Sequence, residues 1–134
     1  MPVDLHKNFA YSLVATAPVP ATSGTSLIVT AADGVKFPTP PFNCTVWATG
    51  AQPLTTNAEI IRVTGISTDT FTIVRAQEGT TARTVVVGDQ IAATITNKTL
   101  TDIETSGFDG ADATENTNVY DELMTPVYDD GVVA

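Results

Sequence analysis

The sequence has little of the chemistry on which most enzymes depend. Among its 134 residues there is one cysteine, Cys44, and one histidine, His6. A single cysteine excludes an internal disulfide framework and a zinc site built from several cysteines. A nucleophilic site needs a base beside the nucleophile, and the only histidine lies far along the chain from Cys44. We therefore predict no catalytic residue and no enzyme.

Positive charge is also scarce. The chain holds six lysine and arginine residues against fifteen aspartate and glutamate residues, and its formal net charge is −9. Proteins that bind nucleic acid use clustered basic side chains to contact phosphates, and anionic membrane surfaces attract basic segments in the same way. We therefore expect no nucleic acid and no membrane among the partners.

Long apolar runs and ligand-binding motifs are missing as well. No stretch approaches the roughly 18 apolar residues of a membrane-spanning helix. The N-terminal residues lack the apolar core of a signal peptide, which predicts folding in a cytosol. The glycine patterns that bind phosphates are absent, and the acids between Asp109 and Glu115 do not have the spacing of a calcium-binding EF-hand loop. We expect no cofactor and no metal.

Threonine, in contrast, is abundant, with 24 residues. It is β-branched and favours strands, and the sequence offers short apolar or alternating segments separated by turn residues. The predicted strands span residues 26–30, 42–48, 58–66, 70–76, 83–87 and 90–96. In the second of them, alternation places Cys44 on the apolar face and Trp47 on the opposite face. Strands of this number and spacing predict an all-β fold, a small antiparallel barrel or sandwich.

The charge divides the chain. Residues 1–98 contain six acidic and six basic residues, whereas residues 99–134 contain nine acidic residues and no basic one. We therefore predict a neutral β body at 26–98 and an acidic C-terminal arm at 99–134. Prolines at positions 2, 18 and 20 indicate an extended N-terminal arm at 1–25, although the alternation of Phe9, Tyr11 and Leu13 fits a strand laid on a surface.

Glycosidases use a pair of carboxyl groups, and Glu59 and Glu78 are the only two glutamates of the predicted body. Arg62 on the same predicted strand as Glu59, and Arg75 on the next one, favour another role, in which ion pairs fix strand and loop geometry. Glu59 is expected to pair with Arg62 or Arg75. A second contact, between Arg75 and Glu78 across the turn that Gly79 permits, would pin the loop.

Several of these segments together resemble a known family. Residues 57–103 contain EIIRV, then a strand that ends in VRAQEGT, then a segment that begins with GD; upstream, SGT precedes a strand and GVKFP follows it. From Asn8 to Ile103, the chain resembles a small β module of tailed-bacteriophage virion structural proteins, of the head-decoration or minor capsid type, which is also seen in tail-fibre proteins. RAQEGTTA at 75–82 is the most specific part, and the acidic arm lies outside the resemblance.

The resemblance implies a non-enzymatic structural protein of the phage particle. We expect a capsid decoration, or cement, protein on the outer face of the virion head, assembled in the host cytoplasm. Its expected partners are the major capsid protein and further copies of itself, as a homotrimer. One alternative is a tail, neck or fibre-attachment module. A third reading is a carbohydrate-binding β domain in which Trp47 stacks on a sugar.

The candidate interface residues are apolar side chains of the two arms, the single tryptophan and the two charged residues of the RAQEGTTA segment. They are Phe9, Tyr11, Leu13, Trp47, Arg75, Glu78, Phe108, Tyr120, Leu123, Met124 and Tyr128.

Overall fold

The structure is a computed structural model, and it describes residues 3–108. Two compact units divide the chain: Asp4–Thr96 holds all the strands described, and residues 97–108 belong to the second unit. In chain order the elements are β1 (Tyr11–Thr16), β2 (Ser26–Val29), the 3-10 helix η1 (Gly34–Lys36), β3 (Phe42–Trp47), β4 (Glu59–Ser67), β5 (Thr70–Gln77), β6 (Gln90–Ala92), α1 (Asn97–Asp102) and η2 (Ile103–Phe108).

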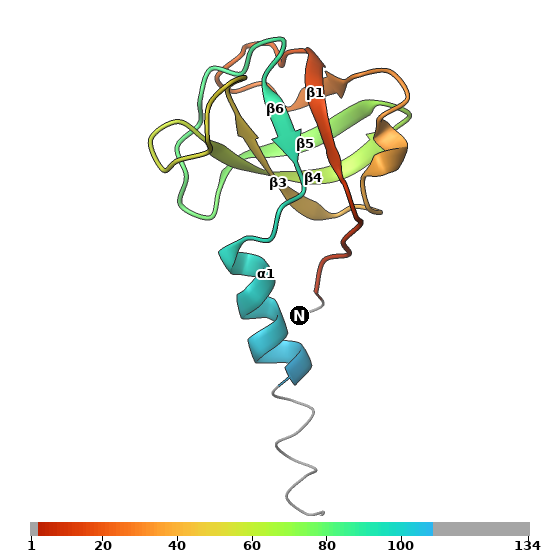
Figure 1. Cartoon of the computed structure of the whole chain (residues 1–134), viewed down its shortest axis with the longest axis vertical. Coiled ribbons are helices and arrows are strands. Elements are labelled where there is room, and N and C mark those ends of the chain that lie inside the picture. Colours follow the sequence, from red (N-terminus) through yellow and green to blue (C-terminus); the bar gives the residue numbers. More distant parts are fainter. Residues whose placement is uncertain (1–2, 109–134) are drawn as a thin grey trace, which may run out of the picture. The chain divides into compact units, whose positions relative to one another are not determined.

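The six strands of the first unit form one closed antiparallel barrel, in the order β1-β2-β5-β4-β3-β6 (Figure 1). The short strand β6 closes it, because it pairs with β1 on one side and with β3 on the other. This arrangement confirms the predicted all-β fold and selects the barrel over the sandwich. A closed barrel leaves no unpaired strand edge, so other chains meet it through side chains.

The strands predicted at 58–66 and 70–76 are confirmed as β4 and β5, which form a hairpin. β4 and β5 are joined by Thr68 and Asp69, and Thr68 has a φ of 58°. The Asp69 carboxylate accepts the N–H groups of Ala32, at 3.0 Å, and Gly34, at 2.8 Å. This contact fastens the turn to η1, so two parts of the chain that are distant in sequence hold each other in place.

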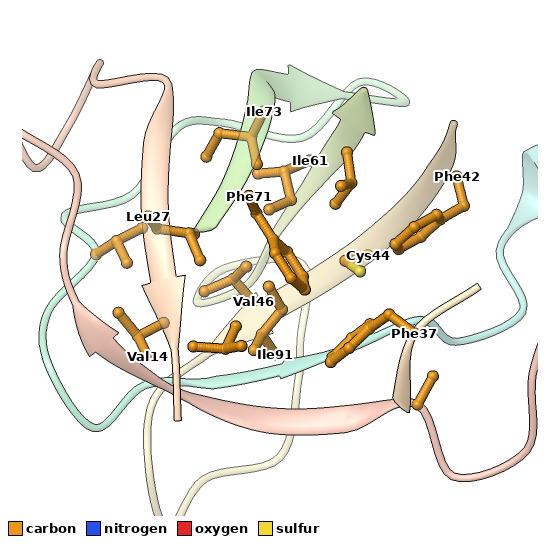
Figure 2. Close-up of a cluster of buried hydrophobic side chains, with 14 residues drawn as sticks. Val14, Leu27, Phe37, Phe42, Cys44, Val46, Ile61, Phe71, Ile73 and Ile91 are labelled. Carbon is orange, nitrogen blue, oxygen red and sulfur yellow. The ribbon is translucent and has the colours of Figure 1, made fainter. Parts of the chain in front are cut away.

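The core fills the barrel with branched aliphatic side chains and three phenylalanines (Figure 2). Cys44 and Val46 of β3 are fully buried, as the alternation predicts. The ring of Phe37 packs edge-on against Phe71 at 4.9 Å and stacks near Phe42 at 6.2 Å, between ring centroids. Each large side chain taken out of water contributes about 1.5–3 kcal/mol, so this set of side chains drives the folding of the unit.

The N-terminal range 1–25, expected to be an extended arm, contributes strand β1 to the barrel. Ser12 and Val14 point inward and are buried, while Tyr11 and Leu13 point outward. The alternation was correctly identified, but its inner face belongs to the core. The prolines at 18 and 20 lie beyond the end of β1, in the loop to β2, so they do not disrupt the strand.

The predicted strand at 83–87 is wrong. The Val85 N–H donates to the Ala21 carbonyl at 3.2 Å, and the Val86 N–H donates to the Asp89 carboxylate at 2.9 Å, instead of to a neighbouring strand. An aspartate close in sequence satisfies the backbone and stabilises a loop, even where the side chains favour a strand. The following strand, predicted at 90–96, is limited to Gln90–Ala92.

The second unit begins with a helix that the sequence analysis did not predict. α1 continues into η2, a π-helix that ends at Phe108, and Lys98 forms an ion pair with Asp102 one turn later. Leu100 and Ile103 are exposed. Four of the candidate interface residues, Tyr120, Leu123, Met124 and Tyr128, lie outside the described residues.

Candidate interaction surface

The RAQEGT segment is anchored by a buried ion pair at one end of the barrel. Glu59, at the start of β4, is completely buried, and the Arg75 side chain is 8% exposed. The Arg75 Nε and Nη2 atoms each donate to one Glu59 carboxylate oxygen, both at 2.8 Å. The expected ion pairing of Glu59 is thus observed, with Arg75 as its partner.

Every donor and acceptor of this pair is used. Besides Glu59, the Arg75 guanidinium donates to the carbonyls of Ala21, Gly24 and Arg83 at 2.8–3.2 Å. The Glu59 carboxylate also accepts the N–H groups of Ala76, at 2.7 Å, and Arg83, at 3.0 Å. Three segments are therefore fastened to one buried pair, which makes Arg75 part of the fold and leaves it little surface to offer to a partner.

These contacts also decide the charge state of the carboxyl. Burial raises the pKa of Glu59, but the hydrogen bonds from Arg75, Arg83 and Ala76 outweigh it and hold the pKa below its usual value. Glu59 is therefore ionised at neutral pH. A carboxylate with all its lone pairs engaged and no exposure has a structural role and does not serve as an acid or base toward a substrate.

The expected contact between Arg75 and Glu78 is not formed. The Glu78 carboxylate lies outside the barrel and accepts a hydrogen bond from the Asn43 Nδ2 atom at 2.6 Å. The loop is instead held by Thr80, whose hydroxyl accepts the Ile60 N–H at 3.0 Å and donates to the Gln77 carbonyl at 2.7 Å. Thr80 therefore holds the loop in place of the expected contact between Arg75 and Glu78.

Three of the candidate interface residues, Tyr11, Leu13 and Trp47, lie on one continuous surface. On the outside of the barrel, Leu13 of β1 is directly opposite Gln90 of β6, which is directly opposite Trp47 of β3. The next row contains Tyr11, Ala92 and Thr45. We call this surface the β1–β6–β3 face. Its outward residues are Tyr11, Leu13, Thr45, Trp47, Gln90 and Thr94.

The β1–β6–β3 face has no charged residue, and most of its polar groups are already hydrogen-bonded within the chain. The Gln90 side chain accepts from the Tyr11 hydroxyl at 3.0 Å and donates to the Ala48 carbonyl at 2.9 Å. The hydroxyls of Thr45 and Thr94 bond to each other at 3.0 Å. The face therefore presents apolar and aromatic surface around Tyr11, Gln90, Thr45 and Thr94, whose side chains each have a partner within the chain.

Phe9, which precedes β1, is a further exposed candidate. Its side chain is 90% exposed, and its backbone has a φ of 59°, in the left-handed region that bulky residues avoid. Pairing of β1 with β6 continues beside it, since the Ala93 N–H donates to the Ala10 carbonyl at 2.9 Å. A large aromatic ring held in solvent on strained backbone adds nothing evident to the fold, which points to a contact role.

Two further apolar residues border the face, and the sequence analysis placed them in a strand instead. Val86 and Val87 are exposed, in a loop where the Gly88 N–H donates to the Val14 carbonyl at 2.8 Å and the Gly88 carbonyl accepts from the Thr49 hydroxyl. These bonds hold the loop beside β1 and the end of β3. The signal in the sequence was the run of valines at 85–87 before Gly88 and Asp89, but it was interpreted as a paired strand.

Trp47 and Cys44 lie on opposite sides of β3. Trp47 is half-buried, on the face opposite Cys44 as predicted. Burial raises the pKa of the Cys44 thiol well above its usual value, so it is protonated and inaccessible. In residues 3–108 no three metal-binding side chains come together in a way that would hold an ion.

Comparison with known proteins gave no match. No protein-family model matches the chain, and no curated protein matches it in sequence. In the part of the chain that the structure describes, none of the helices has the length and apolar character needed to cross a membrane.

Proposed function

We propose that this protein is a non-enzymatic structural protein of a tailed-phage particle, a decoration protein that binds the major capsid protein on the outer face of the head. The observation that carries the proposal is the role of RAQEGT. The residues on which the family resemblance rests are the ones that build one end of the barrel, through the Glu59–Arg75 pair and Thr80. The resemblance to the phage module therefore lies in fold-determining positions.

The division of the chain between barrel and acidic arm also supports a contact role. A small neutral barrel offers limited area, and contacts that extend beyond it let a decoration protein engage several neighbouring subunits. Within residues 3–108, the side chains that stand out are exposed apolar groups on a closed barrel. Such a molecule is suited to binding large partners through its surface.

The number of copies in each particle tests this proposal. Quantitative mass spectrometry of purified virions, with the major capsid protein as internal standard, should give hundreds of copies in a simple ratio to the shell subunit. A few copies for each particle would instead support a neck, tail or fibre-attachment module, which the resemblance also allows. Absence from purified particles would contradict both.

A further inference from the structure

We propose that residues 4–9 form a strap across one end of the barrel, which is held closed by the ion pair between Asp4 and Arg62 and opens while the barrel stays folded. The inference goes beyond the proposed function and does not rest on it. Every contact that carries it lies within the compact unit Asp4–Thr96.

The strap joins opposite walls of the barrel. β1 begins at Tyr11, whereas the Asp4 carboxylate bonds to Arg62 on β4, and two strands separate β4 from β1 in either direction. β1 and β3 both pair antiparallel with β6, so they start at the same end of the barrel. Arg62 also lies at that end, because it is directly opposite Asn43, the second residue of β3. Residues 4–9 therefore cross the barrel at this end.

Polar contacts hold the strap at two points. The Arg62 Nη1 and Nη2 atoms donate to the two Asp4 carboxylate oxygens, at 3.0 and 3.1 Å. Farther along the strap, the Lys7 ammonium donates to the Val35 carbonyl at 2.7 Å. Arg62 has a second partner, since its Nη1 atom also donates to the Asn43 Oδ1 atom at 2.9 Å. The guanidinium therefore stays oriented by β3 when Asp4 leaves it.

The strap contributes no side chain to the core. Residues 5–9 are all exposed, and the core cluster begins at Ala10. Segments with few buried apolar contacts open locally, at much lower free energy than the whole domain unfolds. The φ of 59° at Phe9, where the strap meets β1, adds backbone strain that opening releases. Opening therefore costs only polar contacts near the surface, and it exposes Arg62.

Labelling of arginines in the full-length chain measures this opening. Phenylglyoxal modifies accessible guanidinium groups, and peptide mass spectrometry gives a separate rate for each arginine. Arg75, buried with Glu59, reports unfolding of the whole barrel. Arg83 is the matched control for Arg62, because the two side chains are 20% and 23% exposed and each is paired with a carboxylate. In the wild type, Arg62 should be labelled much faster than Arg75.

Two substitutions in the strap should raise the labelling rate of Arg62 alone. Asp4→Asn removes the charge of the ion pair and should accelerate labelling about fivefold at low salt, with Arg75 and Arg83 unchanged. Lys7→Gln removes the other contact and should accelerate labelling of Arg62 about twofold, although Lys7 does not touch it, because the strap opens as one segment. Lys7→Arg keeps a charged donor for the Val35 carbonyl and should behave like the wild type.

Salt provides a test that needs no substitution. Higher ionic strength screens the partly exposed Asp4–Arg62 pair and should accelerate labelling of Arg62 in the wild type, but much less in Asp4→Asn. Arg83 should respond weakly in both proteins, because its partner Asp89 is 2% exposed and buried pairs are screened less. If Asp4→Asn fails to fold, the salt series of the wild type and Lys7→Gln decide the question.

Three results would overturn the proposal. Labelling of Arg62 no faster than that of Arg75 would mean that it becomes accessible only when the whole barrel unfolds. Equal rates at Arg62 in the wild type and in a folded Asp4→Asn variant would mean that the ion pair does not hold the strap. An Arg62 rate that is unchanged in Lys7→Gln would mean that the pair opens by itself, without the rest of the strap.

These outcomes are independent of the test of function. A chain that is absent from virions but shows the expected labelling of Arg62 refutes the phage role and leaves the strap standing. A chain that is abundant in virions, with Arg62 labelled no faster than Arg75, refutes the strap and leaves the function standing.

Discussion

At the residue scale, the ion pair of Glu59 shows what could be predicted from the sequence and what could not. The charge pattern predicted that it forms an ion pair, because Arg62 lies on the same predicted strand and Arg75 on the next one. Arg62 is excluded by strand alternation, since residues three positions apart on β4 lie on opposite faces. That Arg75 lies beside Glu59 depends on how β4 and β5 pair, which local sequence does not give. Arg62 instead donates to the Asp4 carboxylate, at 3.0 and 3.1 Å. Proximity across a turn suggested Arg75 for Glu78, whereas Glu78 bonds to Asn43, which is distant in sequence.

Removing the charge of Glu59 should destabilise the barrel strongly. Glu59→Gln leaves the buried Arg75 guanidinium without its counterion and turns one acceptor into a donor. Breaking a buried pair from one side costs about 3–5 kcal/mol, and we expect that loss in the free energy of unfolding from urea titration. The control Glu78→Gln changes an exposed glutamate of the same segment and should cost less than about 1 kcal/mol. Equal effects of the two variants would contradict the role of the buried pair.

The lowered pKa of Glu59 predicts a pH dependence with a definite sign. In the unfolded chain this carboxyl has a pKa near its ordinary value of 4.5, and in the folded barrel its pKa is lower. The unfolded state therefore takes up the proton first. The stabilisation is complete above about pH 4.5 and is lost as the pH falls toward the folded pKa.

The difference in unfolding free energy between wild type and Glu59→Gln should accordingly be largest at neutral pH and shrink in acid. Urea titrations of both proteins at a series of pH values measure it, and the acidic residues of the C-terminal range cancel because both proteins contain them. A difference that stays constant from neutral pH to about pH 3 would show that the Glu59 charge does not stabilise the fold.

At the element scale, strands with alternating side chains were predictable and the loops between them were not. β2 to β5 fall where the pattern placed them, because burial of one face fixes a strand with period two. Residues 83–87 have a strand-like composition, yet Asp89 and Ala21 satisfy their backbone in a loop. The bond to Ala21 is long-range and leaves no trace in local sequence, and the same holds for the pairing of β1, whose prolines suggested an arm.

The contact between η1 and the β4–β5 turn should be sensitive to one glycine. A Cβ atom added at Gly34 would lie 1.8 Å from the Thr68 carbonyl oxygen, a backbone atom that cannot move alone. Gly34→Ala should therefore shift the turn and lower the free energy of unfolding by about 1–3 kcal/mol.

Gly65, in β4, provides the matched control for that substitution. A Cβ atom there meets nothing closer than Thr72 at 3.9 Å, so Gly65→Ala should be neutral or slightly stabilising. Denaturant titrations of the two alanine variants measure the contrast. If both change stability by the same amount, close packing of η1 on the turn does not contribute.

At the scale of the whole molecule, the sequence predicted the separation of charge from the neutral barrel, and the structure gives the neutral part its shape. A chain cut after Phe108 loses seven of the nine acidic residues of 99–134, and its formal net charge falls from −9 to −2. The core and the closed sheet lie in Asp4–Thr96, so the cut chain should unfold at the same urea concentration as the full chain.

Urea titrations of the full chain and the cut chain, at low and at high salt, measure this comparison. A large net charge destabilises a compact state through self-repulsion, and salt screens that repulsion. Equal midpoints of the two chains at both ionic strengths would show that the acidic residues beyond Phe108 act independently of the barrel. A cut chain that unfolds at a lower urea concentration would mean that these residues stabilise the barrel, and the core of Asp4–Thr96 would then not account for its stability alone.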